Sequence, residues 1–163
     1  MAAHERPAKS DEWYTPPYVF DAMGARFDMD VAHPGQHVVD WVPTDHVLTA
    51  DSLKRSWSGF LWMNAPFGGR NGLEPWLAKF MAHGDGVALT PDRTSAPWWQ
   101  TYARQADRVL FVSPKIRFIP GSGADESSPA QGTTLMAKGR RGVQALLCAE
   151  MFGLGLGMSK VPL

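Results

Sequence analysis

The sequence has a single cysteine, no excess of either charge and no long apolar run, and each shortage excludes a class of protein. Cys148 alone cannot form an internal disulfide, so a reducing compartment such as the cytoplasm is expected. The 16 basic and 16 acidic residues cancel, which disfavours a passive nucleic-acid coat protein, although local patches can still contact phosphates. No apolar run approaches the roughly 18 residues of a membrane span, and the start has no apolar signal core.

The length and composition predict one domain. A chain of 163 residues with 44% hydrophobic and 20% charged residues is typical of a globular protein with a single core. The first residues are polar and the last are rich in glycine. We therefore expect a flexible N-terminus at residues 1–12, a folded domain at residues 13–150 and a C-terminal tail at residues 151–163.

Short apolar segments alternate with helix-like segments through the middle of the chain. Strands are expected at residues 27–31, 60–63, 86–90, 109–112 and 116–119, with a weak strand at 37–42. Helices are expected at residues 16–24, 72–83 and 96–106, and a hairpin of residues 133–138 and 143–149 would close the chain. This order predicts an α/β fold with a mixed sheet, in which ligands bind beyond the carboxyl ends of the strands.

The turn after the strand at residues 60–63 carries the clearest chemical signal. Asn64-Ala65-Pro66-Phe67 resembles the tetrapeptide of amino-methyltransferases, usually Asn or Asp, Pro, Pro, then Tyr or Phe. An amine on an aromatic ring is a poor nucleophile because its lone pair is shared with the ring. The Asn64 side-chain oxygen and the Ala65 carbonyl could hold its N–H groups and free that lone pair. Pro66 would stiffen the turn, and Phe67 offers a flat face for an extruded base.

Four residues also fit an ordinary turn between a strand and a helix, so the surrounding blocks decide the interpretation. In order, residues 11–17, 27–32, 50–64, 89–94 and 116–118 resemble the conserved blocks of the phage-encoded DNA N6-adenine methyltransferase (phage Dam) family. The resemblance spans residues 11–146 and is more specific than any single block. It implies a single-domain, Rossmann-like class I methyltransferase sheet, mixed and mostly parallel, which uses S-adenosylmethionine to methylate an adenine flipped out of duplex DNA.

The resemblance also implies roles for individual residues. Trp13, Thr15 and Pro16 would line the cofactor, the latter two at its methionine end. Asp28 and Asp30 would face the cofactor, one of them engaging its ammonium group directly or through water, and Asp51 would contact its adenine or ribose end. Arg93, Trp98 and Arg117 would face DNA, although core packing is the stronger expectation for at least one of Trp98 and Trp99. The implied setting is a phage or prophage enzyme in the bacterial cytoplasm, active in restriction-modification.

Three departures from the family pattern bear on activity. Ala65 stands where the family usually has proline, which loosens the turn but keeps the carbonyl. Phe67 replaces the commoner tyrosine and keeps the stacking face. Only Pro34-Gly35 follows Asp30, so the cofactor loop is reduced. The chain is also short for a separate recognition domain, which leaves loops at residues 69–72 and 121–131, or a homodimer partner, to recognise DNA.

Other readings of the same residues stay open. Asp30, His33, His37 and Asp40 have a spacing that could ligate a metal in a small hydrolase or nuclease, although we expect no metal. A non-catalytic DNA-binding or partner subunit is a second alternative. Methyl transfer to an RNA base or a glutamine amide is a third. Seven basic residues could form a phosphate-binding face or a plain solvated surface: Arg104, Arg108, Lys115, Arg117, Lys138, Arg140 and Arg141.

Overall fold

The computed structural model describes residues 13–67, 72–121 and 131–160. In chain order, the strands are β1 (Trp13–Tyr14), β2 (Phe27–Asp30), β3 (Thr44–Val47), β4 (Leu61–Met63), β5 (Gly86–Pro91), β6 (Arg108–Val112), β7 (Ile119–Pro120), β8 (Thr133–Lys138) and β9 (Gly155–Ser159). The helices are α1 (Pro17–Met23), the 3₁₀ turn η2 (Ser52–Lys54), α2 (Glu74–His83), α3 (Pro97–Ala103) and α4 (Gly139–Met151). The expected N-terminal segment, residues 1–12, lies outside the described residues.

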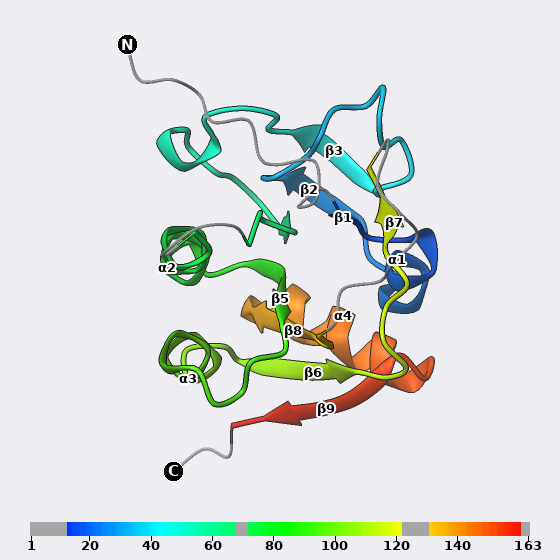
Figure 1. The fold of residues 1–163 in the computed structure, drawn as a ribbon, viewed down its shortest axis with the longest axis vertical. Coiled ribbons are helices and arrows are strands. Elements are labelled where there is room, and N and C mark those ends of the chain that lie inside the picture. The colour runs from blue at the N-terminus through cyan, green and yellow to red at the C-terminus, as the bar shows by residue number, and fades with distance from the viewer. Residues whose placement is uncertain (1–12, 68–71, 122–130, 161–163) are drawn as a thin grey trace.

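A seven-stranded sheet in the order β3-β2-β4-β5-β8-β6-β9 forms the middle layer (Figure 1). β3, β2, β4 and β5 are parallel, whereas β8 runs antiparallel between β5 and β6, so that β6 points the same way as β5. β9 then adds an antiparallel edge strand beside β6. The prediction of a mixed α/β sheet with a parallel core is confirmed.

Helices cover both faces of this sheet because successive side chains of each strand point to opposite faces. On β4, Trp62 joins the core under α1 and α4, while Leu61 and Met63 join the core under α2 and α3. In Figure 1 the pair α1 and α4 and the pair α2 and α3 accordingly lie on opposite sides of the strands. With both faces covered, the parallel strands offer ligands only their ends.

The order of the strands reverses between β2 and β4. The chain leaves β2 for its outer neighbour β3 and then returns to the other side of β2 to form β4. In doubly wound sheets the connections diverge at such a reversal and leave a crevice beyond the carboxyl ends of the two strands. Asp30 ends β2, and Asn64 follows the end of β4.

The edge strand β3 is not where the sequence predicted it. Residues 37–42 form no strand, because the Gly35 carbonyl accepts the N–H groups of Val38 and Val39 and closes a turn. The strand begins after Pro43 instead, where Thr44 pairs with Phe27. This shift matters for the site because it places Trp41 in the loop between β2 and β3.

The predicted closing hairpin is wrong in its second half. β8 forms as expected, but residues 139–151 form the helix α4. Its buried residues, Gly142, Ala145, Leu146 and Ala149, recur at helical spacing rather than in alternation. Gly142 is required there because a Cβ would lie 2.4 Å from the carbonyl oxygen of Gly86, where the helix crosses β5.

Two further segments differ from their predictions. The strand expected at residues 116–119 is reduced to β7, which pairs with β1 rather than with the main sheet. Residues 155–159 belong to the sheet as β9, so the interval predicted as a tail at 151–163 contains a strand. A glycine-rich pattern hides this strand because Gly155 and Gly157 carry no side chain to mark it.

Candidate active site

Asn64 follows the carboxyl end of β4, and its amide is hydrogen-bonded to Trp13 and Thr15. Its Nδ2 donates to the carbonyl oxygen of Trp13 at 3.0 Å and to Oγ1 of Thr15 at 3.2 Å. A carbonyl has lone pairs and no proton, so only the nitrogen of the amide can face Trp13. The Asn64 oxygen therefore points the other way, as the acceptor atom of the side chain.

The three residues after Asn64 pass gradually from the core to the surface. Ala65 is buried, Pro66 is partly buried, and Phe67 is 37% exposed. A buried Ala65 holds its backbone in place by packing, which offsets the missing proline. The exposed Phe67 ring is an apolar surface three residues after Asn64.

Asp30 lies across the strand reversal from Asn64 and is almost completely buried, at 3% exposure. Its Oδ1 accepts the N–H of Ala32 at 3.0 Å. Burial raises the pKa of this carboxyl to about 7, and the single backbone hydrogen bond opposes that shift only in part. A buried carboxyl at the end of a strand, with a perturbed pKa, is typical of a functional site.

His33 follows three residues later and is also buried, at 3% exposure. Its Nδ1 accepts the N–H of Gly35 at 2.9 Å, so Nε2 carries the proton of the neutral ring. Within the described residues this Nε2 has no hydrogen-bond partner, and burial lowers the pKa of the imidazole. Sequence reasoning considered His33 only as a metal ligand; a donor left over in a buried position could not be found without the fold.

Together these groups fit a cofactor that carries both charge and hydrogen-bonding groups. Asp30 supplies a carboxyl that an ammonium group would ionise, and His33 supplies an unpaired N–H donor. The described residues contain no cluster of three histidine, cysteine or acidic side chains that could hold a metal ion. The spacing of Asp30, His33, His37 and Asp40 therefore does not become a metal site in this part of the chain.

One of three comparisons with known proteins identifies the family of the chain. A model of the family "DNA N-6-adenine-methyltransferase (Dam)" matches residues 2–141 of the 163. The chain belongs to this family. No curated protein and no solved structure gives a significant match. Membership places the chain among DNA N6-adenine methyltransferases, whose substrate is DNA, and its α/β sheet is consistent with their Rossmann-like fold.

One predicted cofactor residue lies at the opposite edge of the sheet from Asn64. Asp28 sits near the amino end of β2, where its Oδ2 accepts the N–H of Phe60 at 2.6 Å and pairs with Arg141 at 3.0 Å. The hydrogen bond from Phe60 and then the Arg141 guanidinium lower the pKa of Asp28. The contact of Asp28 with the cofactor stays a prediction. In the structure this carboxyl joins the amino ends of β2 and β4 to α4.

Asp51 remains a candidate with an unusual backbone. It precedes η2 in the left-handed region, with φ of 52°, and its exposed side chain makes no capping hydrogen bond. Left-handed backbone is costly for a residue with a side chain and is concentrated at functional sites. The segment follows the carboxyl end of β3, at the same edge of the sheet as Asp30.

The predicted N-terminal lining residues pack beside Asn64. Thr15 and Pro16 are buried and Trp13 is partly buried against the core under α1. Trp41, from the loop between β2 and β3, donates its indole N–H to the Thr15 carbonyl at 2.8 Å. Pro16 is the N-cap residue of α1.

The candidate DNA contacts separate into different environments. Arg93 follows β5, next to Asn64 in strand order, and its exposed side chain donates to Gln131 at 3.0 Å. Trp98 is partly buried, while Trp99 is 6% exposed and stacks on Phe111, which confirms that one of the two tryptophans is core. Arg117 is exposed on the extended segment between β6 and β7.

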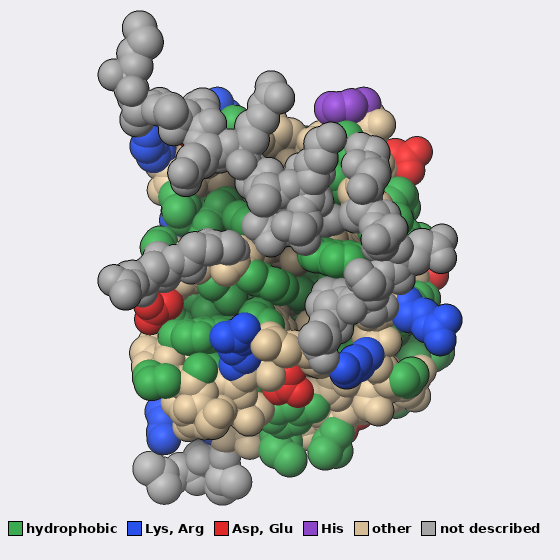
Figure 2. All heavy atoms as spheres, in the orientation of Figure 1, with side chains coloured by type: hydrophobic (Ala, Val, Ile, Leu, Met, Phe, Trp, Pro, Cys, Tyr) green, Lys and Arg blue, Asp and Glu red, His purple; other side chains and the backbone are tan. Residues whose placement is uncertain are grey.

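Three of the seven basic residues are held in ion pairs. Arg108, Lys138 and Arg141 are paired with Glu150, Asp107 and the pair Asp28 and Asp85, respectively. Figure 2 shows basic and acidic side chains of the described residues scattered singly among apolar ones on the face it draws. These pairs favour a solvated surface over a continuous phosphate-binding stripe for this part of the set.

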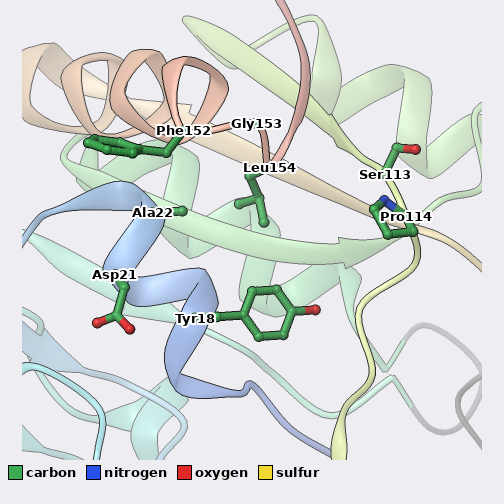
Figure 3. Close-up of a pocket in the computed structure, with 8 residues that line it drawn as sticks. All are labelled: Tyr18, Asp21, Ala22, Ser113, Pro114, Phe152, Gly153 and Leu154. Carbon is green, nitrogen blue, oxygen red and sulfur yellow. The ribbon is translucent and has the colours of Figure 1, made fainter.

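A pocket of about 500 Å³ lies elsewhere, between α1, the turn after β6 and the end of α4 (Figure 3). None of the predicted site residues lines it. Its walls include Tyr18, Leu154 and Phe152, and its one carboxylate, Asp21, points away from the apolar side chains. It lacks the convergent polar groups of a catalytic site.

Among the described helices, none has the length and apolar character needed to cross a bilayer.

Proposed function

We propose that this protein transfers the methyl group of S-adenosylmethionine to the N6 amine of an adenine flipped out of duplex DNA. The observation that carries the proposal is the placement of Asn64 at the strand reversal, with its amide nitrogen engaged and its oxygen left as acceptor. Membership of the Dam family supports adenine in DNA as the acceptor.

On the cofactor side, Asp30 would hold the ammonium group, and Asp51 would contact the adenine or ribose. Trp13, Thr15 and Pro16 would wall the methionine end. When bound, S-adenosylmethionine supplies an electrophilic methyl group. The buried Asp30 carboxyl gains from an ammonium partner because pairing offsets the desolvation that raises its pKa to about 7. The Pro34-Gly35 turn replaces a longer cofactor loop.

On the DNA side, Phe67 would stack on the flipped base while two acceptors hold its amine. The Asn64 oxygen takes one N–H and the Ala65 carbonyl takes the other, which draws the nitrogen towards a tetrahedral shape. The amine would gain the methyl group as its carbon–sulfur bond breaks, the sulfonium would leave as a neutral thioether, and the methylated amine would lose one proton to solvent. Arg93 would contact the DNA near the base, with Trp98 and Arg117 as further contacts. Extrusion of the base costs a few kcal/mol, which these contacts offset.

The wider setting follows from the resemblance. We propose a phage or prophage enzyme that works in the cytoplasm of a bacterial host, in restriction-modification or protection of DNA. A homodimer would supply recognition surface that a chain of 163 residues has little room for. A non-catalytic partner subunit is the alternative, and it predicts DNA binding without methyl transfer.

The test is transfer of a labelled methyl group to competing acceptors. Purified protein is incubated with methyl-labelled S-adenosylmethionine and unmethylated plasmid DNA, total RNA or a glutamine-rich protein. We expect label in DNA alone, and loss of it in Asn64→Ala. Gln144→Ala, an exposed amide on α4, is the matched control and should retain transfer. Label in RNA or protein would show that the acceptor is that molecule rather than DNA. DNA binding without label in any acceptor would favour the non-catalytic partner subunit.

A further inference from the structure

Two residues that precede α1, Trp13 and Thr15, accept hydrogen bonds from the Asn64 amide. We propose that the Trp13 carbonyl, the Thr15 hydroxyl and the Trp41 indole form an amide clasp that fixes which way the Asn64 side chain faces. Thr15 and Trp41 are then positioning residues for methyl transfer, and neither needs to touch the base. This inference rests on the proposed function, because the direction of the amide matters only if Asn64 accepts a hydrogen bond from the amine.

An asparagine amide can be turned over with little change in shape, but the two orientations have opposite chemistry. With its oxygen outward, Asn64 accepts an N–H of adenine. With its nitrogen outward, it presents a donor to a donor, and the two repel. The Trp13 carbonyl settles the orientation because it can accept but not donate, and it lies 3.0 Å from Nδ2. The Thr15 hydroxyl, at 3.2 Å, accepts the second N–H.

The residues of the clasp are held by contacts with segments other than β4. β1 pairs with β7, so the Trp13 carbonyl is attached to a small two-stranded sheet. The Trp41 indole donates to the Thr15 carbonyl at 2.8 Å and fixes the same residue whose hydroxyl meets Asn64. Thr15 is 4% exposed, so water competes little for these bonds.

The clasp also explains why the tetrapeptide begins with asparagine in this chain. Amino-methyltransferases use Asn or Asp at this position, since both carry an acceptor oxygen. Here an aspartate would place a carboxylate oxygen against the Trp13 carbonyl, where neither atom has a proton to share. We therefore expect Asn64→Asp to lower the rate of methyl transfer at neutral pH by about tenfold or more, as a buried acceptor left unpaired would.

Three variants test the clasp at saturating cofactor and DNA. Trp41→Phe removes the indole donor, Thr15→Val removes the hydroxyl, and Thr15→Ser keeps it. We expect Trp41→Phe and Thr15→Val to lower the single-turnover rate about tenfold each. In Trp41→Phe the dissociation constants for cofactor and DNA should stay within about twofold. Thr15→Ser should stay near the unmutated rate. Trp76→Phe, a partly buried tryptophan on α2, is the matched control for loss of an indole.

A second readout does not depend on catalysis. The Asn64 side-chain NH₂ signal, assigned in ¹⁵N NMR by its loss in Asn64→Ala, should exchange slowly with solvent and exchange faster in Trp41→Phe and Thr15→Val. Slow exchange without methyl transfer in the unmutated protein would defeat the proposed function and leave the clasp standing. Methyl transfer with rapid exchange, with unchanged rates in both variants, or with Thr15→Ser as slow as Thr15→Val would overturn the clasp.

Discussion

Two aspartates on one strand show how differently the two edges of this sheet are used. Asp28 and Asp30 are separated by one residue of β2, yet the Asp28 side chain is 43% exposed and paired with Arg141, whereas Asp30 is 3% exposed and has no cationic partner among the described residues. The pKa of Asp28 is lowered and that of Asp30 is raised to about 7. The amino edge pairs its carboxylate with an arginine, whereas the carboxyl edge buries an unpaired carboxyl, which is the group that the proposed ammonium contact requires.

The largest expected effect is the loss of turnover on substitution of Asn64, at the carboxyl edge of the sheet. Asn64→Ala removes the acceptor for the amine, so turnover should fall by about 10²–10³-fold, as when one preorganised hydrogen-bonding group is removed from an active site. Cofactor affinity should stay nearly unchanged. Single-turnover kinetics and calorimetry on the same preparation check both quantities, and an equal loss of cofactor binding would count against the assignment.

The next effect concerns Asp30. Asp30→Asn should weaken cofactor binding about tenfold, because the variant loses a charge-assisted partner for the ammonium group. Between pH 6 and 7.5 the unmutated protein should bind more tightly as pH rises, because a carboxyl with a pKa of about 7 becomes ionised in that range. Calorimetry at several pH values is the measurement. Equal pH dependence in Asp30→Asn would remove this carboxyl from the site.

The same carboxyl makes a prediction for stability. The pKa of Asp30 is higher in the folded chain than its ordinary value of 3.8, so its contribution is fully present below about pH 4 and is lost as pH rises through about 7. Relative to the unmutated protein, Asp30→Asn should therefore gain stability from pH 5 to pH 8. Urea unfolding at the two values measures this, and a constant difference would contradict the raised pKa.

A smaller, several-fold effect compares arginines at the two edges. Arg93→Ala should weaken DNA binding several-fold and reduce the salt dependence by about one phosphate contact. Arg141→Ala should leave DNA affinity unchanged and lower stability, since Arg141 joins Asp28 and Asp85 at the amino edge. Fluorescence anisotropy at several salt concentrations decides the matter; the reverse pattern would exchange the roles of the edges.

The smallest effect is expected at Asp28. Asp28→Asn keeps an acceptor for the Phe60 N–H and loses the charge that pairs with Arg141. Because the pair is largely exposed, the loss of stability should not exceed about 1 kcal/mol. It should disappear as pH falls below the ordinary carboxyl range, since the lowered pKa of Asp28 contributes only where that group is ionised. Cofactor affinity should be unchanged; a clear loss would restore Asp28 to the site.

The sequence predicted the parts of the site that are contiguous. Asn64 to Phe67 lie in one turn, and their chemistry can be read from residue types alone. Asp28 and Asp30 look alike in sequence, because the assignment depends on where β2 ends and on what faces each carboxyl. His33 and Trp41 were missed as site residues for a related reason. The unpaired ring N–H of His33 and the hydrogen bond from the Trp41 indole to the Thr15 carbonyl, 26 residues away in sequence, exist only in the fold.

The fold was predicted where local patterns are strong. β4, β5 and β6 are short apolar runs, and they form within a residue or two of their expected positions. The second half of α4 was mistaken for a strand because residues 143–149 form a short, mostly apolar run, although the buried Ala145, Leu146 and Ala149 repeat at helical spacing. β9 was missed because its pairing with β6 decides its structure, rather than its own glycine-rich composition.

The most direct test of the account is nucleoside mass spectrometry of DNA methylated by this protein. Unmethylated plasmid is incubated with S-adenosylmethionine and either the unmutated protein or Asn64→Ala, then digested to nucleosides. We expect N6-methyladenine with the unmutated protein and a loss of at least about a hundredfold with Asn64→Ala. Equal amounts of N6-methyladenine from both proteins, or none from either, would contradict the claim that the carboxyl edge of β4 is the site of methyl transfer.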